Sequence, residues 1–188
     1  MRDKKSQEIF GTSVLIAGYG REGKSVHAWL AAHYPKLKID VADRATDGDG
    51  YLQHIDSYDT LVRSPGVSPY LPAIVHYRSR GGHITSGTNI FFSLVSGTVI
   101  GVTGTKGKST TSSLLSHILS KKFDDVRLVG NIGIPMLDHL EGADNKTIFV
   151  IELSSHQLED IQYSPHVAVI LNIVPEHLDY YPDFETYK

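Results

Sequence analysis

A run of glycine, lysine and hydroxyl residues contains the residue types that bind phosphate. It reads Gly101-Val102-Thr103-Gly104-Thr105-Lys106-Gly107-Lys108-Ser109-Thr110. In such a loop the backbone amides surround phosphate oxygens, Lys108 neutralises the β and γ oxygens, and the Ser109 hydroxyl binds Mg²⁺. The usual spacing requires glycine at position 102, where this chain has valine. The run predicts a variant P-loop, and the residues expected to bind ATP are Gly104, Thr105, Lys106, Gly107, Lys108, Ser109 and Thr110.

A carboxylate and a histidine follow two later apolar runs. Glu152 comes directly after residues 147–151, and His177 lies in the polar segment after residues 167–171. Because the carboxyl ends of parallel strands meet at one edge of a sheet, both side chains are expected near the P-loop. Carboxylate and imidazole groups there can hold Mg²⁺. The sequence therefore predicts a phosphoryl-transfer site whose catalytic residues are Lys108, Glu152 and His177 and whose metal ligands are Ser109, Glu152 and His177.

Each of these residues also has a structural alternative. Glu152 could supply a charge at a helix start, and His177 could cap or pack. Lys106 also fits a solvent-exposed loop position, Glu176 is assigned to the surface or to a cap, and the role of His156 stays open.

An earlier glycine turn lies between an apolar run and a helical segment. It reads Gly18-Tyr19-Gly20-Arg21-Glu22-Gly23, and Asp43 follows about twenty residues further on, as in dinucleotide-binding folds. Glycines let the backbone approach a diphosphate, and an acid in this place can accept hydrogen bonds from a ribose or a base. The alternatives are a turn that serves only strand-to-helix packing and an NAD site. The Glu22 carboxylate disfavours a diphosphate unless it faces solvent or caps an amide.

A third loop, Ser64-Pro65-Gly66, follows the apolar run at residues 60–63. Its hydroxyl and amide groups could bind phosphate or sugar at the carboxyl end of a strand. An ordinary turn is an equal alternative, because serine, proline and glycine are common in turns.

These loops need strands and helices to position them. Strands are expected at residues 13–17, 38–42, 60–63, 98–102, 126–129, 147–151 and 167–171. Their apolar runs lack strict alternation, which indicates parallel sheets covered by helices on both faces, and therefore the α/β class. Helical spacing at residues 23–33 and 109–121 predicts apolar faces formed by Val26, Trp29 and Leu30, and by Leu114, Leu115, Ile118 and Leu119.

A second strand, turn and helix unit begins directly after residues 93–97, which form the best candidate linker. We therefore expect a Rossmann-like parallel-sheet domain at residues 1–93 and a P-loop α/β domain at residues 94–188.

Composition limits the partners. The net charge of -3 gives no general attraction for nucleic acid or an anionic membrane. With 0 Cys there is no disulfide framework and no thiolate chemistry. Residues 1–10 lack the apolar run of a secretion signal, and the apolar runs are shorter than the roughly 20 residues that span a bilayer. We expect a soluble, cytoplasmic chain that binds neither nucleic acid nor membrane.

The ordered set of motifs resembles the Mur ligase family over nearly the whole chain. The resemblance rests on Gly-Thr-x-Gly-Lys-Ser at 104–109, Gly-Asn-Ile-Gly at 130–133, Glu-Leu-Ser-Ser-x-Gln-Leu-Glu at 152–159 and His-Leu-Asp at 177–179. It implies an ATP- and Mg²⁺-dependent amide-bond ligase of peptidoglycan precursor synthesis. The branch that it resembles most adds D-glutamate to UDP-N-acetylmuramoyl-L-alanine through an acyl phosphate and is a monomer at full length.

The resemblance also implies how the sites are divided. The first domain would bind a UDP-sugar through Gly18, Gly20, Arg21, Glu22, Gly23, Asp43, Arg44, Ser64, Pro65 and Gly66, with Asn131 as a further contact. The second would be the N-terminal part of the central ATP-binding domain. The family's C-terminal domain would be absent, so we expect this chain alone to be inactive. The alternatives are a Mur ligase that adds L-alanine or a diamino acid, and a non-catalytic nucleotide-binding module.

Overall fold

The computed structural model describes residues 9–132 and 134–188. Gly133 of the Asn131 motif and most of the stretch examined for a secretion signal lie outside the described residues. The chain forms two compact units, one ending at Ile90 and the other beginning at Phe91. The division falls within α5 (Gly87–Leu94), so Ser93 and Leu94 of the predicted linker belong to a helix.

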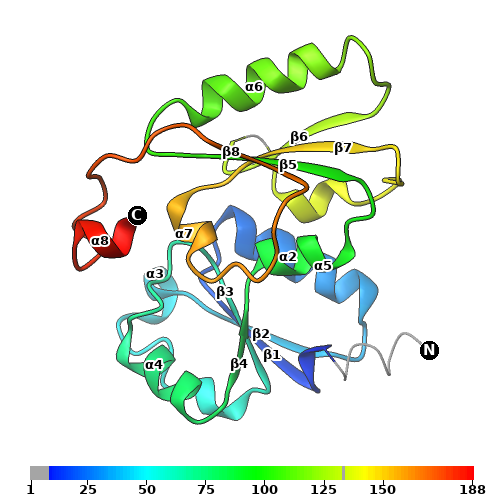
Figure 1. Ribbon diagram of the computed structural model, residues 1–188. Helices are drawn as coiled ribbons and strands as arrows, with labels where there is room; N and C mark the ends of the chain where they lie inside the picture. The colour runs from blue at the N-terminus through cyan, green and yellow to red at the C-terminus, as the bar shows by residue number, and fades with distance from the viewer. Residues whose placement is uncertain (1–8, 133) are drawn as a thin grey trace. The chain divides into compact units, whose positions relative to one another are not determined.

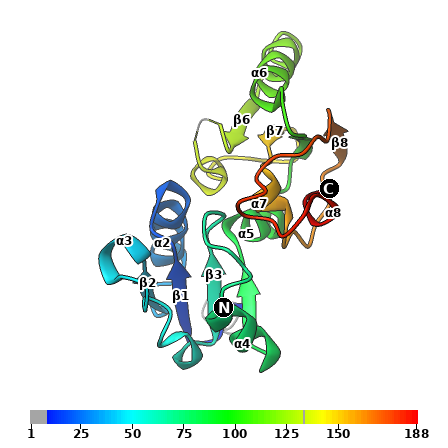
Figure 2. The same cartoon turned by 90° about the vertical axis from the view of Figure 1, so that its left-hand side faces the viewer.

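The first unit is built on a parallel sheet with the strand order β2-β1-β3-β4 (Figure 2). The strands are β1 (Ser13–Ala17), β2 (Lys38–Ala42), β3 (Thr60–Arg63) and β4 (His83–Thr85). Every side chain of β3 is buried, including the polar Thr60 and Arg63 at its ends, as expected of a strand covered on both faces. β4 was not predicted from the sequence, because its three residues are too few to show a periodic pattern.

Helices cover both faces of this sheet. The connecting elements are α2 (Arg21–His33), α3 (Arg44–Asp47), the 3-10 helix η1 (Ile55–Ser57) and α4 (Pro72–Ser79). The chain moves in opposite directions from β1 to β2 and from β3 to β4. Right-handed connections therefore place α2 and α4 on opposite faces (Figure 1). Val26 and Leu30 of α2 are buried as predicted, and Ile74 of α4 packs with Leu15 and Leu61 on the other side.

The second unit has a parallel sheet in the order β6-β7-β5-β8. Its strands are β5 (Thr98–Thr103), β6 (Val126–Gly130), β7 (Ile148–Glu152) and β8 (Val167–Ile170). Between and after them lie α6 (Lys108–Leu119), η2 (Met136–His139), α7 (Ser155–Leu158) and α8 (Phe184–Tyr187). Figure 1 shows α6 along one face of the sheet and α7 on the other. The prediction of successive parallel α/β units is confirmed.

Two predictions about burial in this unit were wrong. Leu114 and Ile118 of α6 are 57% and 56% exposed, because the helix turns Ser112 towards the sheet and these side chains away from it. Val167 and Ile170 of β8 are 49% and 65% exposed, because β8 is the edge strand and pairs with β5 on one side. An apolar run alone therefore did not show which of its side chains are buried.

Among the described residues, no helix has both the length and the apolar character to cross a membrane.

Candidate nucleotide-binding sites

The loops after β1, β2 and β3 surround a cavity of about 770 Å³ in the first unit. β1 lies between β2 and β3 in the sheet, and the cavity lies at the carboxyl ends of these three strands. Open parallel sheets bind ligands at this place. Its lining is Gly18, Gly20, Arg21, Glu22, Gly23, Asp43, Arg44, Asp49, Tyr51, Ser64, Pro65, Gly66, Val67, Ser68 and Leu71. The structure thus brings together every residue assigned to the UDP-sugar except Asn131, which lies in the second unit.

The glycines of the first turn have different structural reasons. A Cβ atom at Gly23 would lie 2.1 Å from the Gly18 carbonyl oxygen, so only glycine lets α2 pack this closely against the turn. A Cβ atom at Gly20 would meet no atom within 4 Å. Ser64 ties the loop after β3 to the same turn, because its hydroxyl donates to the Gly18 carbonyl at 2.7 Å. Gly23 and Ser64 therefore fix the turn, and Gly20 leaves its cavity side open.

Asp43 is bound by the backbone around it. Its Oδ2 accepts a hydrogen bond from the Tyr19 amide at 2.5 Å, and its Oδ1 accepts one from the Ala45 amide at 2.8 Å. The bond from Tyr19 and then that from Ala45 lower the pKa of Asp43 below its ordinary value of 3.8. Asp43 is also the N-cap of α3. Its carboxylate therefore links the glycine turn to the loop after β2, whatever else it binds.

In the second unit the P-loop leaves the end of β5 and enters α6 at Lys108. Gly104 and Gly107 have φ angles of +134° and +86°, which glycine adopts without strain. The Lys108 ammonium group donates to the carbonyl oxygens of Gly104 at 2.8 Å and Thr105 at 3.1 Å. Ser109 and Thr110 are exposed on the first turn of α6. The predicted phosphate-binding groups are thus carried by a loop between a buried strand and a helix N-terminus.

Glu152 lies at the same edge of the sheet. It pairs in register with Val102 of β5 and Gly130 of β6, at the carboxyl ends of all three strands. The side chain is 2% exposed, and its Oε1 accepts a hydrogen bond from the Asn131 side-chain Nδ2 at 3.0 Å. Its Oε2 is buried without a hydrogen-bond partner among the described residues. A buried carboxylate oxygen in this state is costly unless a cation approaches it.

His177 lies among aromatic rings and has a positive φ of 56°. Its ring centroid is 5.1 Å from that of His156 and 6.4 Å from that of Tyr187. The Tyr187 hydroxyl in turn lies 2.8 Å from the Thr105 hydroxyl of the P-loop. The segment that carries His177 is therefore attached to the phosphate-binding loop through Tyr187.

Comparison with known proteins identifies the family. The model of the Mur ligase middle domain matches residues 102–188, which include the P-loop, Glu152 and His177. A UDP-N-acetylmuramoyl-L-alanine--L-glutamate ligase from Xanthomonas axonopodis is 35% identical over 96% of this chain and 44% of its own length. A UDP-N-acetylmuramoylalanine--D-glutamate ligase from Acetivibrio thermocellus is 39% identical over 92% of this chain and 38% of its own. The chain belongs to the Mur ligase family.

Solved structures of Mur ligases share the fold. A murein peptide ligase from Neisseria meningitides, "UDP-N-acetylmuramate:L-alanyl-gamma-D-glutamyl-meso-diaminopimelate ligase", has a TM-score of 0.51 at 18% identity and covers 94% of this chain. UDP-N-acetylmuramate-alanine ligase from Thermotoga maritima has a TM-score of 0.51 at 21% identity and covers 93%. This chain spans 65% and 45% of those chains, and less than half of the curated relatives named above.

Glu152 of this Mur ligase chain has the chemistry of a Mg²⁺ ligand. Within residues 9–132 and 134–188, no three His, Asp or Glu side chains form a group that could hold a metal ion. Glu152, with its unpaired buried oxygen, fits Mg²⁺ as one ligand among phosphate oxygens and water.

Several residues of the two sites were missed from the sequence. The cavity is also lined by Asp49, which accepts a hydrogen bond from Arg44 at 2.7 Å, and by Tyr51, whose hydroxyl pKa is raised by burial.

In the second unit, Glu176, assigned to the surface or to a cap, pairs with Lys106, and the hydrogen bond from that lysine lowers the pKa of Glu176. Asn172 bonds the P-loop directly. Its position directly after an apolar strand was the available signal.

Proposed function

We propose that this chain carries the UDP-sugar site and the ATP site of a glutamate-adding Mur ligase. The observation that carries the proposal is the single sheet edge at which a P-loop and a buried carboxylate with an unpaired oxygen lie on adjacent strand ends. Such an edge suits transfer of a phosphoryl group from ATP. The names of the relatives supply the substrates for the rest of the proposal.

The cavity of the first unit would take the UDP part of UDP-N-acetylmuramoyl-L-alanine. Its volume of about 770 Å³ lies within the usual range for small-molecule sites. The glycine turn opens α2, whose N-terminal amides favour a diphosphate. Arg21 and Arg44 line the cavity and add positive charge.

The second unit would bind ATP, which Mur ligases require. The amides of Gly107 and Lys108 would hold the phosphates, because those of Thr105 and Lys106 already donate to Asn172. The Lys108 ammonium group would offset charge on the transferring phosphoryl group. Mg²⁺, held by Ser109, Glu152 and His177 with phosphate oxygens, would neutralise further charge there.

In the proposed reaction the UDP-muramoyl-alanine carboxylate attacks the γ-phosphorus of ATP and forms an acyl phosphate with release of ADP. The amino group of glutamate then attacks the acyl carbon, phosphate leaves, and an amide bond forms. The relatives' names include both D- and L-glutamate, and we keep D-glutamate as the prediction. The use of ATP and the lack of cysteine support a cytoplasmic location.

Calorimetry tests the first site. UDP-N-acetylmuramoyl-L-alanine should bind the chain more tightly than NAD, and Arg21→Ala should weaken UDP binding about tenfold by removing a charged contact. Arg78→Ala, an exposed arginine of α4 outside the cavity lining, is the matched control and should have no effect. Tighter binding of NAD would overturn the proposal for this unit.

A chimera tests the reaction. In this chimera, the chain replaces the part of the Acetivibrio thermocellus relative that it matches. Phosphate release is then measured with ATP, Mg²⁺, UDP-N-acetylmuramoyl-L-alanine and either enantiomer of glutamate. We expect D-glutamate-dependent turnover that Lys108→Ala lowers at least about a hundredfold, and no turnover from the unfused chain. A folded chimera that stays inactive, or one indifferent to Lys108→Ala, would refute the assignment of the P-loop.

A further inference from the structure

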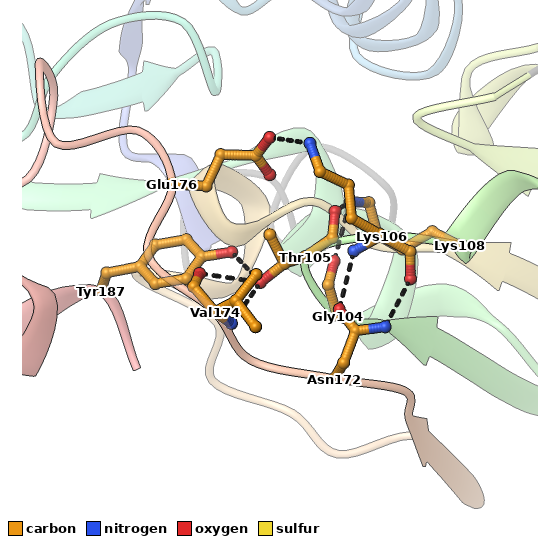
Figure 3. A network of polar contacts seen from close by, with 8 residues as sticks. All are labelled: Gly104, Thr105, Lys106, Lys108, Asn172, Val174, Glu176 and Tyr187. Atoms are coloured by element: carbon orange, nitrogen blue, oxygen red, sulfur yellow. Dashed lines mark hydrogen bonds and ion pairs between the residues drawn. The ribbon is translucent and has the colours of Figure 1, made fainter.

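The P-loop is held from outside by the segment that follows β8. Its central residues Thr105 and Lys106 lie between Gly104 and Gly107, which have no Cβ atom and can adopt several backbone conformations. Figure 3 shows Thr105 and Lys106 bonded to residues of the segment 172–176 and to Tyr187. The shape of the loop is thus set by long-range contacts as well as by its own sequence.

Asn172 forms three hydrogen bonds with the backbone of the loop. Its side-chain Oδ1 accepts a hydrogen bond from the Lys106 amide at 3.0 Å, and its Nδ2 donates to the Lys106 carbonyl oxygen at 2.9 Å. Its own carbonyl oxygen accepts a hydrogen bond from the Thr105 amide at 2.8 Å. One asparagine therefore satisfies three backbone groups of two consecutive loop residues.

These bonds continue the pairing of β5 and β8 beyond the strands. The last strand pair is Thr103 with Ile170, and the Leu171 amide still donates to the Thr103 carbonyl at 3.0 Å. At the next step Gly104 approaches Asn172 so closely that a Cβ atom there would lie 3.0 Å from its backbone nitrogen and oxygen. The side-chain amide of Asn172 then pairs with Lys106 as a strand backbone would.

The other contacts of the loop bind side chains and do not fix its backbone. The Lys106 ammonium group pairs with Glu176, but it lies on an exposed, flexible side chain that does not fix the backbone. The Thr105 hydroxyl bonds the Val174 backbone and Tyr187, which anchors a side chain. Asn172 binds both the N–H and the carbonyl oxygen of Lys106, so it holds the two peptide groups that flank this residue.

We propose that Asn172 is a positioning residue of the ATP site, which holds the P-loop in its phosphate-binding shape without touching the nucleotide. The inference rests on the proposed ATP site. Pre-forming the loop removes the ordering cost that ATP would otherwise meet on binding.

The test measures ATP binding, loop exchange and folding of the same chain. Asn172→Ala removes both side-chain bonds and should weaken ATP·Mg²⁺ binding about tenfold. Hydrogen exchange of the Lys106 amide should accelerate, while the melting temperature stays close to that of the unaltered chain. Asn172→Asp keeps the acceptor for the Lys106 amide but sets a carboxylate against its carbonyl, so ATP binding should weaken while that amide stays protected. Asn145→Asp, at an exposed turn of the same unit, is the matched control.

The outcomes separate the two proposals. If the unaltered chain binds no ATP·Mg²⁺, the proposed nucleotide site is wrong. If it binds and Asn172→Ala binds equally well, Asn172 does not position the loop. Loss of the cooperative melting transition in both variants would assign Asn172 to folding and also overturn the inference.

Discussion

At the scale of single residues, the proposed ATP site contains a lysine whose ammonium group is hydrogen-bonded and a buried glutamate with one unpaired oxygen. Lys108 is bonded to two carbonyl oxygens of its own loop, whereas Glu152 is buried with one carboxylate oxygen unpaired. A buried charge without compensation destabilises the fold. Removing the charge of Glu152 should therefore raise the stability of the chain without ligand and lower its affinity for a cation.

Glu152→Gln should separate these effects. The amide has nearly the same shape but no charge, so without Mg²⁺ we expect a melting temperature equal to or above that of the unaltered chain. The rise in melting temperature that ATP and Mg²⁺ cause in the unaltered chain should largely disappear in this variant. Differential scanning calorimetry with and without ATP·Mg²⁺ measures both. Asp124→Asn, at an exposed position of the same unit, should leave the shift intact. A strongly destabilised, ligand-responsive Glu152→Gln variant would show that the carboxylate is structural.

At the scale of elements, the first site depends on how closely α2 packs behind β1. A methyl group at Gly23 would collide with the Gly18 carbonyl oxygen, which is backbone and cannot rotate away. Gly23→Ala should therefore lower the free energy of unfolding by about 2–3 kcal/mol. Gly20→Ala meets no atom and should change it by less than about 1 kcal/mol while weakening UDP binding. Urea denaturation compares the pair, and equal losses would contradict the packing argument.

Asp43 gives the first unit a pH dependence. Hydrogen bonds from Tyr19 and then Ala45 lower its pKa, so the ionised form stabilises the fold above the ordinary value of 3.8. This contribution is lost as the pH falls through the lowered pKa of the folded state. Asp43→Asn should therefore lower the free energy of unfolding by about 1 kcal/mol at pH 7, because the amide has one acceptor oxygen for the two backbone N–H groups of Tyr19 and Ala45 and carries no charge.

The difference between Asp43→Asn and the unaltered chain should shrink once the pH lies below the folded pKa of Asp43. Chemical denaturation at a series of pH values measures it, and Asp124→Asn again serves as the control. A difference that stays constant down to acid pH would show that the charge of Asp43 contributes nothing.

At the scale of the whole molecule, β8 presents an open strand edge with exposed apolar side chains. Val167 and Ile170 lie on the strand, and Ile173 and Val174 follow it. Open apolar edges promote pairing with other chains. The described chain should therefore associate as its concentration rises.

Ile170→Lys should raise the concentration at which association begins severalfold, because a charge on the edge opposes pairing. Sedimentation velocity over a concentration series measures the effect. Leu114→Lys removes an equally exposed apolar residue from α6, away from the strand edge, and should act less strongly. Equal effects of the two substitutions would assign association to apolar surface in general.

The local features of both sites could be predicted from the sequence. The glycine turns, the strand before each of them, and Glu152 at the end of a strand all follow from turn chemistry and from runs of apolar residues. These signals are short-range, so a few neighbouring residues carry them. Motifs in the same order along the chain were also enough to indicate the Mur ligase family.

Which strand ends lie side by side depends on the packing of the whole sheet. The order β6-β7-β5-β8 places β8, and not the next strand in sequence, beside the strand that carries the P-loop. That neighbour brings Asn172 to Lys106, and the edge position of β8 leaves Ile170 exposed. Neither could be predicted, because pairing between distant segments depends on the packing of all the elements and leaves no periodic pattern in the residues themselves.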